Sequence, residues 1–139
     1  VYTDMNGVES VRSSRSDGFG LDMLRHQSET QALIMSREVS SVVAARAKKL
    51  EIEVFQAVME KDQAIQSLIQ ERKLKADEIV YIGNDLNDLV VIPYVGYFCC
   101  PSDAHPMVRR QADLVLDHPG GDGAIRELCE KILAQMRSL

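Results

Sequence analysis

The chain has 139 residues, of which 45% are hydrophobic and 27% are charged, a balance typical of one soluble globular domain and not of a disordered or fibrous chain. The net charge is −5 and the basic residues are scattered, which argues against nucleic-acid binding because neutralising phosphates needs clustered lysines and arginines. No apolar run approaches the roughly 20 residues that span a bilayer, so we expect no membrane segment and a cytoplasmic location.

The three cysteines have neither the spacing of metal ligands nor a partner pattern for disulfides, so we expect them to be small core residues. At the amino end, residues 1–4 are strand-like and Asn6-Gly7 is a turn signal. Residues 7–15 predict one arm of a β-hairpin whose partner arm lies upstream. Asp17-Gly18 is expected to end this arm, before a short helix that begins at Phe19.

Short apolar runs then alternate with amphipathic segments. Strands are predicted at 31–35, within 52–58, and at 79–82, 97–100 and 114–116. Helices are predicted at 39–50, 61–74, 86–92 (ended by Pro93), 106–111 and 124–136. Because helices and short strands alternate without an internal repeat, the sequence predicts an α/β fold with a doubly wound parallel sheet.

Polar side chains follow the run 79–82, which is apolar at every position and predicts a central strand covered on both faces. Gly83 allows the backbone to turn, and four oxygen-bearing side chains come next: Asn84, Asp85, Asn87 and Asp88. Ligands bind at the carboxyl ends of parallel strands, and Mg²⁺ takes few protein oxygens. These side chains therefore indicate either a Mg²⁺ site or a helix N-terminus with an acidic first turn.

Two further polar residues precede this cluster in chain order. Ser36 follows the strand at 31–35, and Lys61 begins the helix after the next strand. A hydroxyl, an ammonium and a metal-binding cluster at neighbouring strand ends suit a phosphoryl group. The alternatives stay open: Ser36 can cap the following helix, and Lys61 can be a solvated lysine at a helix start.

This ordered set resembles the second, third and fourth motifs of the haloacid dehalogenase superfamily. The likeness extends to its small capless phosphatases, which act on 3-deoxy-D-manno-octulosonate 8-phosphate and on nonulosonate (sialic-acid type) 9-phosphates and include domains linked to acylneuraminate cytidylyltransferases. It covers essentially the whole chain through ordered landmarks: Asn6-Gly7-Val8-Glu9, Asp17-Gly18-Phe19-Gly20, Ser36-Arg37-Glu38, Val42-Val43-Ala44-Ala45-Arg46, Lys61, residues 81–88, Val95-Gly96, Asp103-Ala104-His105-Pro106 and residues 120–127.

The resemblance implies a three-layer α/β Rossmann-like fold with a central parallel sheet, a β-hairpin flap and no cap domain, spread over residues 1–139 as one phosphatase domain. Without a cap, relatives shield the reaction by forming homotetramers in which the hairpin and terminal helix of one chain close the site of another. The apolar Val8 and Val11 on the hairpin fit this arrangement. The pathways implied are lipopolysaccharide or sialic-acid biosynthesis.

The activity implied is Mg²⁺-dependent removal of phosphate from a phosphorylated sugar acid through an aspartyl-phosphate. Ser36 would hydrogen-bond a phosphate oxygen and Lys61 would offset its charge. Asn84, with Asp85, would hold Mg²⁺ directly or through water, and Asp88 would orient loops or Lys61. The candidate substrate contacts are Arg15, Asp17 and Arg126.

Some of these residues have other interpretations. Arg126 can meet a carboxylate of the sugar acid or of a neighbouring subunit, or pair with a surface acid. His105 can reach a sugar or cap the next helix. The loop 120–123 can admit an anion to a helix N-terminus or be a plain turn.

The first departure from the family pattern concerns the nucleophile. Asp4-Met5-Asn6-Gly7 imitates the first motif only superficially, since too few apolar residues precede Asp4 to form a central strand. Asp4 also lies nearer to Asp17 than the family's spacing implies. We therefore expect the nucleophilic aspartate, with the first catalytic strand, to lie upstream of residue 1.

The second departure is Asn84, which stands where many relatives have a metal-binding aspartate. An amide oxygen can bind Mg²⁺ but brings no charge, so affinity should fall unless an acid compensates. The two departures motivate an alternative function, namely a weak or inactive oligomerisation domain associated with an acylneuraminate cytidylyltransferase.

Overall fold

The computed structural model describes residues 1–138, and the chain divides into two compact units. One unit comprises Val1–Ala57 together with the C-terminal segment from Gly121, and the other comprises Val58–Gly120. The expectation of a single domain stays a prediction. The two units are described in turn.

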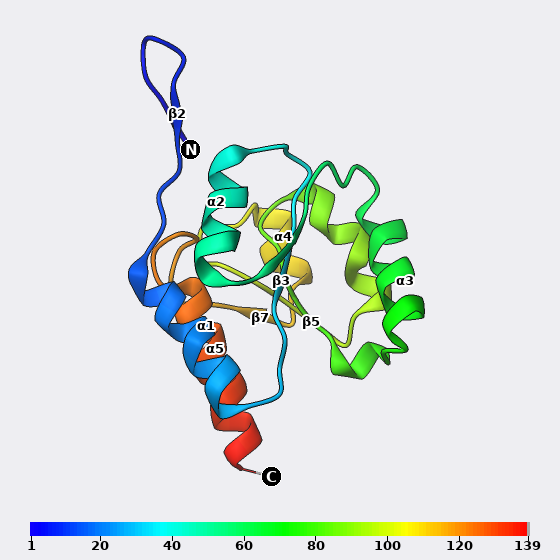
Figure 1. Ribbon diagram of the computed structural model, residues 1–139. Helices are drawn as coiled ribbons and strands as arrows, with labels where there is room; N and C mark the ends of the chain where they lie inside the picture. Colours follow the sequence, from blue (N-terminus) through cyan, green and yellow to red (C-terminus); the bar gives the residue numbers. More distant parts are fainter. Residues whose placement is uncertain (139) are drawn as a thin grey trace. The chain divides into compact units, whose positions relative to one another are not determined.

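The first unit begins with a hairpin, in which β1 (Tyr2–Thr3) pairs antiparallel with β2 (Glu9–Ser10). The Asp4 carboxylate accepts hydrogen bonds from the backbone N–H groups of Asn6 (2.8 Å) and Val8 (2.9 Å), and these bonds stabilise the turn. The partner arm is Tyr2–Thr3, which lies upstream of residues 7–15 as expected, although the pairing on the second arm is limited to Glu9–Ser10. The hairpin extends away from helix α1 (Figure 1).

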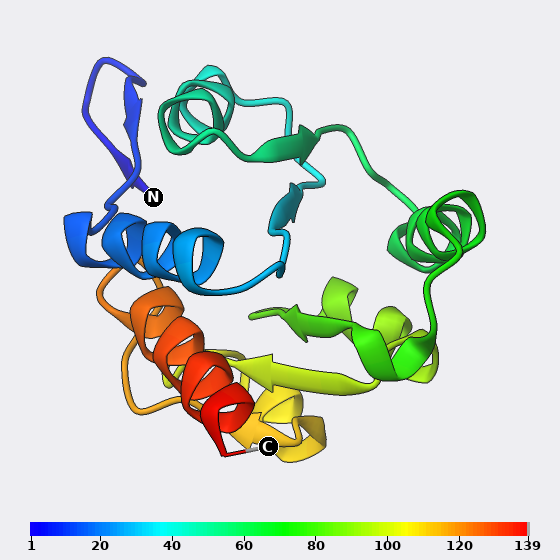
Figure 2. The ribbon, with the colours of Figure 1, turned by 60° about the horizontal axis from the view of Figure 1, so that its bottom comes forward.

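Helix α1 (Arg15–Gln27) begins earlier than the sequence predicts, because Ser14 caps it and Asp17 and Gly18 lie buried in its first turn. These two residues were interpreted as a turn signal, and tertiary packing overrides that local preference. Helix α5 (Ala124–Arg137) runs beside α1 in Figures 1 and 2. A Cβ at Gly20 would lie 2.8 Å from the Arg126 Cα, so only glycine allows the two helices to approach this closely.

Two parallel strands complete this unit: β3 (Leu33–Met35) and β4 (Glu53–Phe55). Helix α2 (Ser41–Leu50) connects them, and Ser40 caps its N-terminus by accepting a hydrogen bond from the Val43 N–H. The βαβ arrangement is the one that the alternating pattern predicts.

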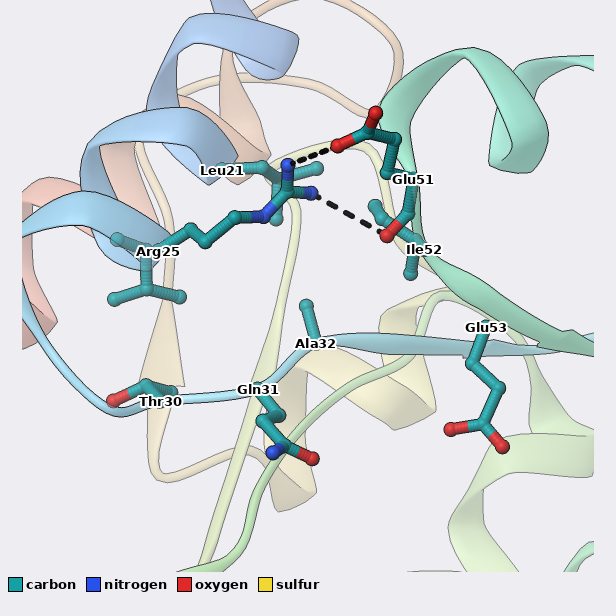
Figure 3. A pocket seen from close by; sticks show the side chains of 9 residues that line it. Leu21, Arg25, Thr30, Gln31, Ala32, Glu51, Ile52 and Glu53 are labelled. Atoms are coloured by element: carbon teal, nitrogen blue, oxygen red, sulfur yellow. Dashed lines mark hydrogen bonds and ion pairs between the residues drawn. The ribbon is translucent and has the colours of Figure 1, made fainter.

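A cavity of about 220 Å³ lies between α1 and the segments that flank β3 and β4 (Figure 3). Arg25 reaches across from α1 and binds the Glu51 carboxylate at 3.1 Å and the Leu50 carbonyl oxygen. It therefore satisfies the C-terminal end of α2. None of the predicted catalytic, metal or substrate residues lines this cavity.

The second unit contains a parallel ladder in the order β5 (Val80–Ile82), β6 (Tyr97–Cys100) and β7 (Leu114–Val115). The central strand is β6, in which Phe98, Cys99 and Cys100 are fully buried. The sequence placed β5 at the centre. It is instead an edge strand of this ladder, and Val80 is 43% exposed.

This unit also contains four helical segments: α3 (Lys61–Arg72), η1 (Ala76–Glu78), η2 (Leu86–Tyr94) and α4 (Pro106–Gln111). The 3-10 helix η2 packs against both α3 and α4. Pro93 lies inside η2 and does not end it, because a 3-10 turn can continue past one missing N–H.

The predicted α/β class with parallel strands is confirmed, and the sequence placed the bounds of β6 and α4 correctly. All three cysteines are buried free thiols, as expected. No helix within residues 1–138 has both the length and the apolar character needed to cross a membrane.

Candidate active site

A buried ion pair joins the start of α3 to the first turn of η2. The Lys61 Nζ lies 2.6 Å from the Asp88 Oδ1, and the two side chains are only 9% and 4% exposed. Lys61 is the first residue of α3, where the helix dipole disfavours a cation, so the position depends on its carboxylate partner. The interpretation of Lys61 as a solvated surface lysine is therefore wrong.

Tyr81 of β5 is a second donor to the same oxygen, since its hydroxyl lies 2.7 Å from the Asp88 Oδ1. The ring of Tyr81 stacks on that of Phe98, its neighbour across the β5–β6 ladder, with centroids 5.7 Å apart. The Tyr81 ring therefore packs on the neighbouring strand while its hydroxyl reaches Asp88.

The other Asp88 oxygen binds the loop that follows β5. Its Oδ2 accepts hydrogen bonds from the backbone N–H groups of Asn84 (2.9 Å) and Asp85 (3.2 Å). A Cβ at Gly83 would lie 2.5 Å from the Asp88 Cβ, so glycine is required where the loop passes the carboxylate. Asp88 therefore organises the whole site through four hydrogen bonds.

Burial opposes ionisation of Asp88, yet the hydrogen bonds from Lys61 and Tyr81 and the charge of Lys61 hold the pKa of this carboxyl below its usual range. Burial and the nearby Asp88 charge raise the pKa of Tyr81 well above its ordinary value. At neutral pH Asp88 is therefore ionised, and it accepts a hydrogen bond from the neutral Tyr81 hydroxyl.

Asn84 and Asp85 are exposed beside this buried network. Asp85 caps η2, because its Oδ1 accepts a hydrogen bond from the Leu86 N–H at 2.7 Å. The Asn84 side chain makes no hydrogen bond to any other of the described residues. The alternative of a capped, acidic helix start is therefore realised through Asp85 and Asp88, while the Asn84 amide stays available.

A hard cation such as Mg²⁺ binds oxygen ligands, and Asn84 and Asp85 carry such oxygens. Within residues 1–138, no group of three or more His, Cys, Asp or Glu side chains is arranged to hold a metal ion. Asn84 and Asp85 can offer one oxygen each, which fits a hard cation that takes its other ligands from water and phosphate. They fit Mg²⁺ as a partial set of ligands.

Ser36 follows β3 in the other unit, and its hydroxyl oxygen accepts a hydrogen bond from the Glu38 N–H at 3.2 Å. Because Ser40, and not Ser36, caps α2, the alternative role of Ser36 as a helix cap is wrong. The Ser36 hydroxyl proton is left to donate. Its part in a phosphate site with Lys61 stays a prediction.

Asp17, expected to contact substrate, is 8% exposed and holds the N-terminus of α5. Its Oδ1 accepts a hydrogen bond from the Arg126 backbone N–H (2.9 Å), and its Oδ2 accepts one from the Gly123 backbone N–H (3.3 Å). The anion at the end of the glycine loop is thus the chain's own Asp17. Both oxygens have a partner, so this geometry supports a structural role and not substrate contact.

Two of the remaining candidates have side-chain partners. The Arg126 Nε donates to the Glu130 Oε1 at 2.6 Å, so its alternative role of pairing with a surface acid is realised. The His105 Nδ1 accepts from the Met107 N–H at 3.1 Å and so caps α4. Arg15 is exposed at the start of α1, and its substrate role stays a prediction.

Sequence reasoning brought Lys61, Asn84, Asp85 and Asp88 together correctly but missed Tyr81. Tyr81 was read only as an apolar member of a buried strand. No local signal marked it, because its contact with Asp88 depends on the return of η2 toward β5.

A family model described as haloacid dehalogenase-like hydrolase matches residues 24–128. The chain is 31% identical over 134 residues to the 3-deoxy-D-manno-octulosonate 8-phosphate phosphatase KdsC of Escherichia coli strain K12. This match covers 96% of the chain and 71% of the E. coli protein.

Two solved structures are also similar. One is the phosphatase of the same name from Moraxella catarrhalis in complex with magnesium, phosphate and a KDO molecule; it is 29% identical with a TM-score of 0.87, covering 96% of this chain and 76% of that one. The other is a cobalt-bound deoxy-D-mannose-octulosonate 8-phosphate phosphatase from Haemophilus influenzae. It is 30% identical with a TM-score of 0.85, and the match covers 99% of this chain and 80% of that one.

Proposed function

We propose that this chain, which belongs to the haloacid dehalogenase-like hydrolase family, removes phosphate from a phosphorylated sugar acid. The observation that carries the proposal is the buried Lys61–Asp88 pair beside Asn84 and Asp85. The relatives named above are phosphoric monoester hydrolases acting on 3-deoxy-D-manno-octulosonate 8-phosphate, which is therefore the first substrate to test. A nonulosonate 9-phosphate is the second.

Lys61 supplies the positive charge at this site. Asp88 uses one N–H of the ammonium, and the other two can point to oxygens of the phosphoryl group. A cation that is largely shielded from water stabilises the charge of a phosphoryl group more strongly than one in bulk solvent. Ser36, in the first unit, stays the proposed hydroxyl donor to phosphate, and its proton remains available because its oxygen accepts from the Glu38 N–H.

Asn84 and Asp85 hold a divalent cation, for which Mg²⁺ is the first candidate. Relatives have been solved with magnesium and with cobalt, both divalent ions. When bound, such an ion neutralises charge on the phosphate oxygens. Asp88 keeps the Asn84–Asp85 loop in place by accepting hydrogen bonds from the two backbone N–H groups. It is not itself a ligand of the cation.

The phosphoryl acceptor is an aspartate that we place N-terminal to Val1, on a strand whose sequence carries the family's first motif. The position of β5 at the end of its ladder and the 43% exposure of Val80 support this placement, because an edge strand with an exposed apolar side chain favours a covering element. The aspartate attacks phosphorus, a neighbouring aspartate protonates the sugar oxygen, and water then hydrolyses the aspartyl-phosphate.

A homotetramer would shield the reaction from water. The hairpin supports this proposal, because Tyr2 and Val8 are each 62% exposed and Met5 is 100% exposed, as expected for a surface that another subunit covers. The cytoplasmic location stays a prediction.

Phosphate release from both sugar acid phosphates tests the proposal, measured on the protein of native length with Mg²⁺ and again with a chelator. We expect release that depends on the metal and that Lys61→Met abolishes. A Lys48→Met variant, which changes a lysine in the last turn of α2, is the matched control and should keep full activity. Absence of release from both substrates and from an aryl phosphate would overturn the proposal and favour the inactive oligomerisation domain, to which Asn84 also points.

A further inference from the structure

Tyr81 donates a hydrogen bond that the stacking of its ring does not require. A phenylalanine would stack on Phe98 equally well, yet the Tyr81 hydroxyl lies 2.7 Å from the Asp88 Oδ1. No buried side-chain polar atom within residues 1–138 lacks a hydrogen-bond partner, so the hydroxyl is part of a complete network.

The network limits how Lys61 can bind Asp88. Backbone N–H groups of Asn84 and Asp85 occupy the Asp88 Oδ2, and the Tyr81 hydroxyl shares Oδ1. A carboxylate has about four acceptor positions, and three of them are taken by these donors. Lys61 is thus confined to a single contact at Oδ1, which leaves two of its N–H groups for another anion.

The Tyr81 hydroxyl also competes with Lys61 for the Asp88 Oδ1. A hydrogen bond to an ionised carboxylate is charge-assisted and therefore strong. Without that donor, Asp88 would neutralise Lys61 more completely and could take a second ammonium N–H. The affinity of Lys61 for a phosphate oxygen would fall.

We propose that Tyr81 is a positioning residue that, by sharing the Asp88 Oδ1, keeps the Lys61 ammonium in a single contact and directed at the phosphoryl group. The inference rests on the proposed function and deepens it. Tyr81 touches neither substrate nor reacting atoms in this scheme, and it acts through Asp88 and Lys61 alone.

The test compares Tyr81→Phe with Phe98→Leu in the protein of native length. The first variant removes the hydroxyl and keeps the ring, and the second removes the ring stack and keeps the hydroxyl. For Tyr81→Phe we expect the inhibition constant of inorganic phosphate and the KM to rise roughly fivefold, since a hydrogen bond to a charged group is lost. For Phe98→Leu we expect lower stability with both constants unchanged.

A second readout is the NMR signal of the Lys61 ammonium, assigned by its loss in Lys61→Met. It should shift in Tyr81→Phe and stay in place in Phe98→Leu. Unchanged phosphate inhibition and an unchanged ammonium signal in Tyr81→Phe, or equal changes in both variants, would overturn the inference. If the wild-type protein neither releases nor binds phosphate, the proposed function fails, while the ammonium signal still decides whether Tyr81 positions Lys61.

Discussion

The Lys61 Nζ lies 2.6 Å from the Asp88 Oδ1, and both side chains are almost completely buried. Withdrawing two charges from water is unfavourable, so such a pair adds little net stability compared with apolar residues, whereas removing one partner leaves a buried charge unpaired. This asymmetry suits a functional site, where the ammonium is retained for its charge.

Asp88→Asn should therefore be strongly destabilising. The change keeps the shape of the side chain but leaves the Lys61 ammonium without a counter-charge, and we expect a loss of about 3–5 kcal/mol in the free energy of unfolding. Urea titration measures it. The double variant Asp88→Asn/Lys61→Met should recover part of the loss, because no charge is then buried. A loss below about 1 kcal/mol in the single variant would contradict the structure's account of the pair.

The contribution of Asp88 to the free energy of unfolding should decrease at acidic pH. The folded-state pKa is lowered by the bonds from Lys61 and Tyr81, although burial opposes this, while in the unfolded chain it is about 3.9. The ionised Asp88 therefore contributes its full stabilisation at pH values above the pKa of the unfolded state. This stabilisation is lost as the pH falls through the lower pKa of the folded state. The difference in unfolding free energy between wild type and Asp88→Asn should be constant from pH 5 to 8 and narrow below about pH 4. A difference that narrows already near neutrality would contradict this assignment.

Gly83→Ala should disrupt the site. The added Cβ would lie 2.5 Å from the Asp88 Cβ, a distance that forces the loop away from the carboxylate. We expect a loss of roughly 2 kcal/mol or more and weaker phosphate inhibition. Gly7→Ala is a useful comparison, because its φ of +77° makes alanine unfavourable by about 1 kcal/mol while nothing lies within 4 Å of its Cβ. Equal losses in the two variants would show that the contact with Asp88 is unimportant.

Asp17→Ala distinguishes a structural role from substrate contact. Both Asp17 oxygens accept hydrogen bonds from backbone N–H groups at the N-terminus of α5. We therefore expect the free energy of unfolding to fall by about 1–2 kcal/mol, as for other helix caps. The KM for the sugar acid phosphate should be unchanged at temperatures where the variant is folded. A raised KM without a loss of stability would restore the role that the family resemblance gave to this residue.

The sequence predicted best those elements whose signals are local. The apolar run 97–100 and the proline at position 106 determine where β6 and α4 begin, and the structure agrees. The start of α1 could not be found in this way. Asp17 and Gly18 have turn preferences, and they become helical because Asp17 caps a helix more than a hundred residues away.

The same reasoning explains the site. Polar groups at the carboxyl ends of parallel strands meet at one edge of a sheet, so their place in the chain is enough to bring them together. The residues predicted in this way follow strands or begin helices: Lys61, Asn84, Asp85 and Asp88. Tyr81 lies inside a strand, and its role arises from the return of η2 toward β5, which brings Asp88 to the Tyr81 hydroxyl. This relation is not encoded in the residues next to Tyr81.

Asn84→Asp should increase the affinity for Mg²⁺. A carboxylate would replace a neutral amide that has no partner among residues 1–138, and hard cations bind more tightly as ligand charge increases. We expect the Kd for Mg²⁺, measured by calorimetry, to fall about tenfold, equivalent to about 1.4 kcal/mol.

Asn87→Asp is the matched control, since it adds the same charge three residues along the chain, within η2. It should change the Kd for Mg²⁺ much less, because a charge that is not a ligand acts only through a screened field. If both variants tighten Mg²⁺ binding equally, the effect is one of general charge, and Asn84 is not the ligand. If only Asn84→Asp tightens it, the amide oxygen of Asn84 is the position at which the cation binds, and the low charge of this site is a property of that one residue.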